Sequence, residues 1–135
     1  MNTFIDGISK IVYYLPLLNI TLSSYFLKQR EKIQNFLLLI VFNVIINYII
    51  KFSLKEPRPI DNHKFDIYGM PSGHSQIMTF LTFYIYYKTK NINLFIFNFI
   101  STILVLIQRY KSNEHSLEQI LFGSFIGFIF STFFN

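Results

Sequence analysis

Five charged or imidazole side chains stand out in this 135-residue sequence because of their types and their spacing. Six residues separate Lys51 from Arg58, five separate Arg109 from His115, and the tetrapeptide Pro71–His74, Pro-Ser-Gly-His, lies between the two pairs. Taken singly, a Lys or Arg near the end of an apolar segment is expected to anchor a helix by extending its charge toward lipid headgroups. Three such cations that accompany two histidines and a Ser-Gly pair instead favour a shared site.

This combination of residues suits the transfer of a phosphoryl group. The group carries negative charge on its equatorial oxygens, so catalysis depends on fixed positive charge, which Lys51, Arg58 and Arg109 can supply. Ser72 and Gly73 are expected to open a helix whose free backbone N–H groups form an anion site, with the Ser72 hydroxyl as a further donor. The two histidines add the remaining chemistry, because neutral imidazole can attack phosphorus and imidazolium can protonate a leaving oxygen. Such a site is expected to work without a metal or any other cofactor.

Hydropathy predicts that these side chains are positioned by an all-α, multi-pass transmembrane helical bundle. Hydrophobic residues make up 52% of the chain and charged residues 14%, with a mean hydropathy of +0.40, whereas roughly a quarter of the residues of a soluble domain are charged. Pro16 is expected to kink the first segment or to leave it partly in the membrane interface. About five spans are predicted: Phe4–Leu27, Asn35–Leu54, Ser75–Tyr87, Ile92–Gln108 and Leu117–Phe134.

The whole chain, residues 1–135, is expected to form a single membrane domain with its chemistry between residues 51 and 119. The segment Met1–Lys10 contains Asp6 and lacks a basic region before a small-residue cleavage site, so we expect it to belong to the mature protein. Cysteine is absent, which excludes a disulfide framework and a thiolate metal site in this sequence. The net charge of +5 is scattered between apolar segments, and nucleic-acid binding is therefore not expected.

If the spans alternate in direction, the candidate residues meet at one membrane face. The long connection 55–74 and the intermediate connection 109–116 both belong to this face, and His63, in the long connection, is expected to be solvated. The opposite face carries five bases, Lys28, Arg30, Lys32, Lys88 and Lys90, whereas the face with the candidate site carries six, Lys51, Lys55, Arg58, Lys64, Arg109 and Lys111. Because three of these six are assigned to the site, the distribution of bases favours cytoplasmic short loops and a lumenal or extracytoplasmic site.

Three stretches of the sequence resemble the signature motifs of the type 2 phosphatidic acid phosphatase superfamily of membrane lipid phosphatases. They are Lys51 with Arg58-Pro59, Pro71–His74, and Arg109 with His115, and the resemblance covers roughly the last two-thirds of the chain. It implies that His115 is a nucleophile that becomes phosphorylated and that His74 is the general acid. It also implies metal-independent catalysis and a phosphate-binding role for the remaining matched positions, Lys51, Arg58, Ser72, Gly73 and Arg109.

Two positions depart from the general pattern of the superfamily, which has Ser before the third-motif Arg and Asp four residues after the nucleophile. This chain has Gln108 and Gln119 there, and a neutral Gln119 can orient the histidine ring without supplying charge. Gln at the second position is typical of the dolichyl-diphosphatase and glucose-6-phosphatase branches, and the stretch 68–76 looks especially like the dolichyl-diphosphatase version. Glu118, three residues after His115, could supply the missing charge or could be a solvated residue at the end of a span.

The sequence is accordingly identified as a member of this superfamily, with polyprenyl (dolichyl) diphosphate as the first candidate substrate. Phosphatidate or another lipid monophosphate is the second candidate, and a soluble sugar phosphate is the third. A non-catalytic membrane protein that binds phosphorylated lipid is the rival hypothesis. The expected partners are the lipid phosphate and the bilayer, and the oligomeric state stays open. The expected location is the endoplasmic reticulum with a lumenal site, or alternatively a bacterial inner membrane with a periplasmic site.

Overall fold

The computed structural model describes residues 2–27, 30–60 and 67–134, with the side chains of residues 2–5 and 30–32 left aside. Some residues named in the sequence analysis therefore lie outside the described part of the chain. They are Lys28, His63 and Lys64, and the side chains of Arg30 and Lys32. In the part of the chain that is described, the structure is helical, with α1 Asn2–Tyr13, α2 Leu15–Phe26, α3 Arg30–Leu54, α4 Gly73–Thr89, α5 Ile92–Lys111 and α6 Leu117–Phe133.

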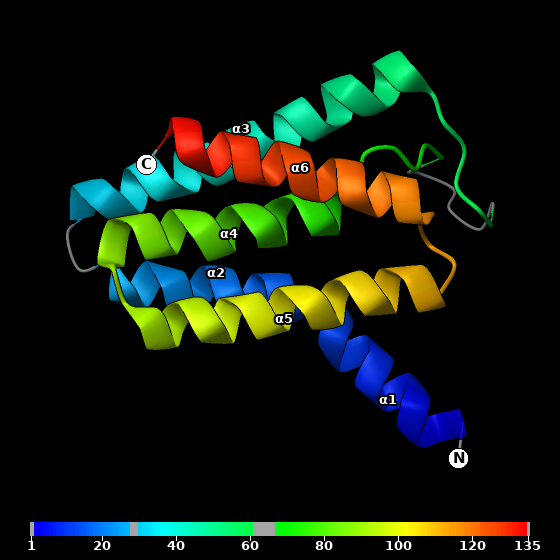
Figure 1. Cartoon of the computed structure of the whole chain (residues 1–135), viewed down its shortest axis with the longest axis horizontal. Coiled ribbons are helices and arrows are strands. Elements are labelled where there is room, and N and C mark those ends of the chain that lie inside the picture. Colours follow the sequence, from blue (N-terminus) through cyan, green and yellow to red (C-terminus); the bar gives the residue numbers. More distant parts are fainter. Residues whose placement is uncertain (1, 28–29, 61–66, 135) are drawn as a thin grey trace.

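The first predicted span is divided into two helices. Helix α1 ends at Tyr13, and α2 begins at Leu15, after one intervening residue, with Pro16 in its first turn. Proline lacks the backbone N–H that would continue the hydrogen bonding of α1, but it fits the first turn of a new helix. Helix α1 consequently diverges from the bundle, whereas α2 packs beside α4 and α5 (Figure 1).

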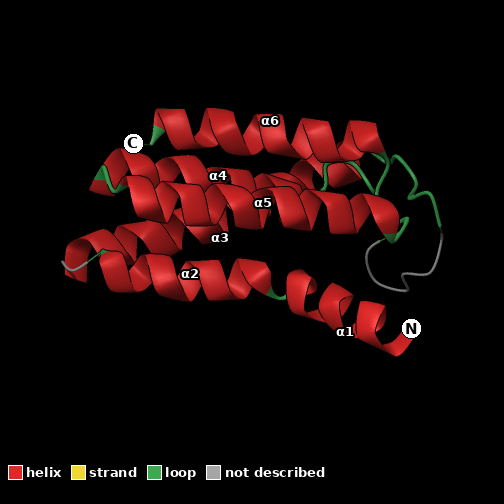
Figure 2. Cartoon of the chain, turned by 60° about the horizontal axis from the view of Figure 1, so that its bottom comes forward, coloured by secondary structure: helices red, strands yellow, loops and turns green. Residues whose placement is uncertain are grey.

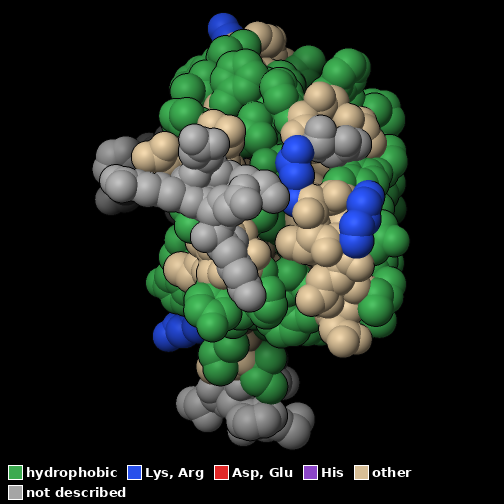
Figure 3. Space-filling model, turned by 90° about the vertical axis from the view of Figure 1, so that its left-hand side faces the viewer, with side chains coloured by type: hydrophobic (Ala, Val, Ile, Leu, Met, Phe, Trp, Pro, Cys, Tyr) green, Lys and Arg blue, Asp and Glu red, His purple; other side chains and the backbone are tan. Residues whose placement is uncertain are grey.

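Helices α2 to α6 run alternately in opposite directions (Figure 1). Residues 55–60 and 67–72 of the connection between α3 and α4, together with the connection 112–116, therefore lie at one end of the bundle. The short connection Lys90–Asn91 lies at the other end (Figures 1 and 2). The view onto this second end shows apolar side chains over the flanks and a few Lys or Arg side chains among them (Figure 3). The arrangement agrees with the expectation that the candidate residues share one end.

Helix α4 is the centre of the bundle, and its closest neighbour is α6. A Cβ atom on Gly123 of α6 would stand 2.5 Å from the backbone oxygen of Ser72, and one on Gly127 would overlap the backbone of Gln76. The two glycines lie four residues apart, on one face of α6, and allow the helix backbones to touch. This close approach fixes α6 against the first two turns of α4.

Helix α3 joins α4 through buried amide side chains as well as through apolar contacts such as the stacked rings of Phe36 and Tyr84. Asn47 Nδ2 donates to Gln76 Oε1 over 2.8 Å, and Gln76 Nε2 donates to Asn43 Oδ1 over 2.9 Å. All three side chains are buried. A buried amide needs hydrogen-bond partners, so this network fixes the rotation of α3 relative to α4.

The prediction of five spans is confirmed in its helical character but not in its count. Among the described residues, two segments, Ile33–Leu54 and Ile92–Lys111, are long and apolar enough to cross a membrane. Helix α6 is apolar but has 17 residues, and at 1.5 Å per residue it rises about 25 Å, less than the hydrocarbon core of about 30 Å. Helix α4 also has 17 residues and buries several polar side chains against its neighbours.

Candidate functional site

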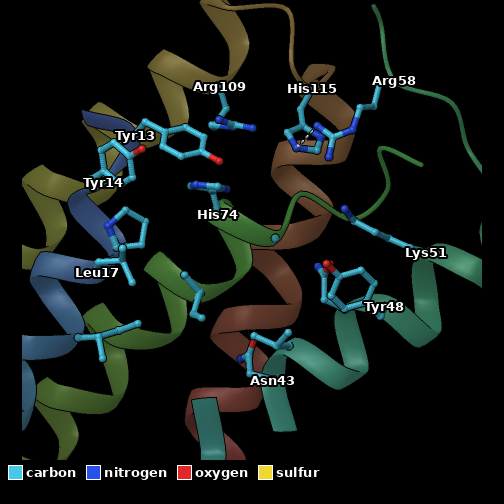
Figure 4. Close-up of a pocket in the computed structure, with 16 residues that line it drawn as sticks. Tyr13, Tyr14, Leu17, Asn43, Tyr48, Lys51, Arg58, His74, Arg109 and His115 are labelled. Atoms are coloured by element: carbon cyan, nitrogen blue, oxygen red, sulfur yellow. Dashed lines mark hydrogen bonds between the residues drawn. The ribbon is translucent and has the colours of Figure 1, made fainter. Parts of the chain in front are cut away.

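A cavity of about 590 Å³ lies at the end of the bundle where the two longer connections meet. Figure 4 shows the side chains of Arg58, His74, Arg109 and His115 directed toward one space, with Lys51 approaching from α3. Six of the eight sequence-predicted site residues line the cavity: Lys51, Arg58, Gly73, His74, Arg109 and His115. They come from α3, α4, α5 and two connections, so tertiary packing brings residues far apart in the sequence into one site.

The start of α4 contributes a helix N-terminus to this cavity. Ser72 is the N-cap residue, and its Oγ accepts hydrogen bonds from the backbone N–H and the hydroxyl of Ser75. Gly73 and His74 follow and line the cavity, whereas the side chain of Ser72 is buried beneath them. Free N–H groups and the positive end of the helix dipole make this position attractive to an anion.

Arg58 and Arg109 are held by one carboxylate, that of Glu114. Glu114 Oε2 lies 3.4 Å from Arg58 Nη1 and 3.2 Å from Arg109 Nη2. Both arginine side chains are 4% exposed, compared with 23% for the side chain of Glu114. The carboxylate offsets part of the repulsion between two buried cations and so stabilises their approach to each other.

The N-terminal helices contribute Tyr13 to the wall of the cavity. Its ring lies 4.9 Å from the ring of His74, centroid to centroid, and the guanidinium carbon of Arg109 lies 5.2 Å from its centroid. The cation is positioned over the π face of the ring, which is a favourable electrostatic arrangement. Sequence analysis missed this residue because it precedes all three motifs.

The amide of Gln119 determines which nitrogen of His115 carries a proton. Gln119 Nε2 lies 2.9 Å from Glu56 Oε1 and 2.8 Å from the carbonyl oxygen of Pro57. Both atoms only accept hydrogen bonds, so the amide nitrogen must face them and Oε1 must face the histidine. Gln119 Oε1 also accepts from the backbone N–H of Ser116 over 3.2 Å, which confirms the orientation.

His115 Nδ1 lies 3.2 Å from Gln119 Oε1 and therefore donates to it. Its other nitrogen, Nε2, then carries a lone pair, and Arg58 Nη1 donates to that lone pair over 3.2 Å. The ring is 2% exposed. Burial, followed by the nearby charges of Arg58 and Arg109, lowers the pKa of His115 from 6.5 to about 3, so the free protein holds this imidazole neutral at physiological pH.

Three further residues acquire contacts that the sequence did not predict. Glu56 and Glu114 received no role from the sequence, and the structure shows both hydrogen-bonded to site residues. Gln108, the unexplained departure from the motif, donates from Nε2 to Ser9 Oγ over 3.1 Å and links α5 to α1. Glu118 is exposed on the first turn of α6, whereas the carboxylate in contact with Gln119 belongs to Glu56.

One signal in the sequence could have predicted the position of Gln119. The pattern Ser-x-x-Gln from Ser116 to Gln119 is that of a capping box, and the structure shows both of its reciprocal hydrogen bonds. The same Oε1 atom thus caps α6 and orients His115. The position of Glu56, 63 residues earlier, depends on tertiary structure.

The family model described as the PAP2 superfamily matches residues 32–135. The chain is 40% identical to the "palmitoyl-protein thioesterase-dolichyl pyrophosphate phosphatase fusion 1" of Schizosaccharomyces pombe, with 65% of this chain and 16% of that protein covered. It is 35% identical to the dolichyldiphosphatase of Saccharomyces cerevisiae, with 64% of this chain and 44% of that protein covered.

A third relative, dolichyldiphosphatase 1 of Dictyostelium discoideum, is 33% identical, with 65% of this chain and 44% of that protein covered. The chain thus spans less than half the length of each of these relatives. Among solved structures, a transmembrane PAP2 type phosphatidylglycerolphosphate phosphatase from Bacillus subtilis has the same fold, with a TM-score of 0.74 and 20% identity. The alignment covers 98% of this chain and 74% of that one.

Proposed function

The chain belongs to the PAP2 superfamily, and from that premise we propose that it is an integral membrane phosphatase that hydrolyses a polyprenyl diphosphate to the monophosphate. Dolichyl diphosphate is the first candidate substrate, because three relatives with dolichyl diphosphate phosphatase names are 33–40% identical to it. The observation that carries the proposal is the cavity, where two histidines, three cations and a helix N-terminus surround one space.

The shape of the cavity suits an amphiphile. Beyond the charged residues its wall is largely apolar, with contributions from Pro16, Leu17, Ile20, Val44 and Ile77. Tyr14 and Tyr48 lie between the two regions. A lipid diphosphate can place its charged head against the cations and its first isoprene units along α2 and α3, where apolar contacts stabilise it.

In the first step of the proposed reaction, His115 Nε2 attacks the terminal phosphorus. The Nε2–P bond forms and the bond from phosphorus to the bridging oxygen breaks, while His74 donates a proton to that leaving oxygen. Lys51, Arg58 and Arg109 stabilise the charge that develops on the equatorial oxygens. Arg58 moves from the lone pair of His115 to a phosphate oxygen when substrate binds.

In the second step, water hydrolyses the phosphohistidine. His74, now neutral, removes a proton from the attacking water, the Nε2–P bond breaks, and inorganic phosphate is released. Backbone N–H groups at the start of α4 remain available to the phosphate in both steps, with Gly73 permitting its close approach. We assign the phosphate-binding role to Ser72 as well, through its position as N-cap, and the orientation of His115 to Gln119.

We further propose that residues 1–135 act as one membrane domain with its site at the lumenal face of the endoplasmic reticulum. The candidate residues gather at a single end of the bundle, where the lipid head can enter while its tail stays in the bilayer. A bacterial inner membrane with a periplasmic site remains the alternative location. Protease protection of the connection 55–72 in sealed microsomes would test the orientation, since a lumenal loop is protected until detergent is added.

The test is phosphate release from dolichyl diphosphate and, separately, from phosphatidate, by detergent-solubilised protein in the presence of chelator. The native chain is expected to release phosphate from dolichyl diphosphate with a higher kcat/KM than from phosphatidate. His115→Asn is expected to release phosphate from neither. Preference for phosphatidate would assign the chain to lipid monophosphates. Binding without release by well-folded native protein would refute the enzymatic proposal and favour a lipid-binding role.

A second measurement separates the roles of the two histidines. An aryl phosphate with a good leaving group needs little protonation, so His74→Asn should still be phosphorylated by it but should hydrolyse the intermediate slowly. An acid-labile phosphoenzyme is therefore expected to accumulate in His74→Asn and to be absent from His115→Asn. A phosphoenzyme in His115→Asn would contradict the assignment of the nucleophile.

A further inference from the structure

The carboxylate of Glu56 stands directly behind Gln119 on the side away from His115. Gln119 Nε2 donates to Glu56 Oε1 over 2.9 Å, while Gln119 Oε1 accepts from His115 Nδ1 over 3.2 Å. The three side chains form a continuous chain of hydrogen bonds from an acid, through an amide, to an imidazole. His115 and Gln119 are buried, and Glu56 is half-buried at the outer end.

The connection that carries Glu56 is built around the Gln119 amide. The backbone N–H of Gly69 donates to the carbonyl oxygen of Glu56 over 2.7 Å, and Pro57 pairs with Tyr68 in an antiparallel bridge. A Cβ atom on Gly69 would overlap the Gln119 side chain, coming within 2.5 Å of its Cδ. Glu56 and Gly69 thus enclose the amide from two sides and restrict it to one orientation.

A histidine nucleophile becomes cationic when its Nε2 bonds to phosphorus and its Nδ1 keeps a proton. In the general pattern that this sequence resembles, an aspartate four residues later meets that cation, whereas Gln119 carries no charge. An amide that donates to a carboxylate is polarised, so that its oxygen becomes a stronger acceptor. The negative charge that Gln119 lacks can therefore be supplied by Glu56, which lies one side chain further from His115.

We propose that Glu56 is a positioning residue of this phosphatase, supplying through the Gln119 amide the negative charge that stabilises His115 in its phosphorylated, cationic form. The inference rests on the proposed function. The Nε2–P bond forms and the P–O bond of the substrate breaks as described above, and the leaving oxygen takes its proton from His74. The Nδ1 proton stays on His115, and neither Gln119 nor Glu56 gains or loses a proton.

The experiment compares Glu56→Gln with Glu118→Gln, two changes that each remove one carboxylate near His115. Glu118 is exposed and supplies the matched control. With dolichyl diphosphate as substrate, Glu56→Gln is expected to lower kcat roughly tenfold or more, because the interaction acts in a poorly solvated site, with KM within about twofold. Glu118→Gln is expected to keep native kinetics.

A rescue distinguishes charge from packing. Gln119→Asp added to Glu56→Gln places a carboxylate one residue nearer to His115, and this double variant is expected to recover at least about fivefold in kcat over Glu56→Gln alone. If Glu56→Gln loses its cooperative thermal transition, the pair Glu56→Asp and Glu56→Asn replaces it. These two side chains are equally short and differ in charge, and Asp should be the faster.

The outcomes separate the two proposals. A native chain that releases no phosphate removes the proposed function and this inference with it. Three results would overturn the role of Glu56 alone. They are a native kcat in Glu56→Gln, a loss of kcat in Glu118→Gln as large as in Glu56→Gln, and equal kcat values for Glu56→Asp and Glu56→Asn.

Discussion

Replacing Gly123 by Ala is expected to impair both the stability and the activity of the protein. The added Cβ would stand 2.5 Å from the carbonyl oxygen of Ser72, 3.2 Å from its nitrogen and 3.3 Å from its carbonyl carbon. Ordinary van der Waals contact begins at 3.4 Å, so α6 and the start of α4 must separate by up to 3.4 − 2.5 = 0.9 Å. The obstacle is backbone, which cannot rotate away as a flexible side chain does.

The displacement has a structural and a catalytic cost. Forcing one methyl group into a closely packed contact costs about 1–3 kcal/mol of stability, which corresponds to a fall of roughly 3–10 °C in Tm. The same movement shifts the phosphate cradle of α4 relative to His115 and Gln119, at the start of α6. A misplacement of about 1 Å can reduce catalysis roughly a hundredfold, so a tenfold to hundredfold loss in kcat/KM is expected.

The matched control is Gly7→Ala in α1, where an added Cβ meets nothing within 4 Å. Both substitutions bring the same gain in helix propensity, about 1 kcal/mol, so their difference isolates the contact between helices. Thermal unfolding in detergent and phosphate release from dolichyl diphosphate are measured for both variants. A Gly123→Ala protein as stable and as active as Gly7→Ala would refute the packing argument.

Four other predictions concern the site and its support. Since the pKa of His115 is lowered to about 3 by burial first of all, its NMR signals in the free protein should not titrate between about pH 5 and pH 8. Folding keeps His115 neutral, so its contribution to stability is fully present above the unfolded pKa of 6.5 and is lost as the pH falls toward 3. The Tm should therefore decrease between pH 7.5 and pH 5 by more in the native chain than in His115→Gln. Tyr13→Ala should raise KM roughly threefold to thirtyfold, because Arg109 loses an aromatic face, while Tyr13→Phe should retain the native KM; equal KM values for all three proteins would contradict the contact. Asn47→Leu deprives Gln76 Oε1 of its buried donor at 2.8 Å and should cost about 1–3 kcal/mol in unfolding measurements, whereas an unchanged Tm would show that the donor is replaceable.

The sequence predicted the helices more accurately than it predicted the number of spans. The expected segments Asn35–Leu54 and Ile92–Gln108 correspond to α3 and α5, which are the two helices of the described residues that are long and apolar enough to cross a membrane. Apolar length is a local property, and it can be read from residues that are consecutive in the chain. The first segment was less predictable, because whether a proline kinks a helix or ends it depends on what the flanking turns pack against.

The sequence by itself determined the all-helical class, the superfamily and the gathering of Lys51, Arg58, His74, Arg109 and His115 at one end of the bundle. These follow from local hydropathy, from motif spacing and from the alternation of helices. Tertiary structure alone decided how the site is supported: Tyr13 over Arg109, Glu114 between the two arginines, and Glu56 behind Gln119. Each of these is a contact between side chains on separate helices or loops. The sequence cannot distinguish a charged residue at the end of an apolar segment that faces water from one that faces a buried amide.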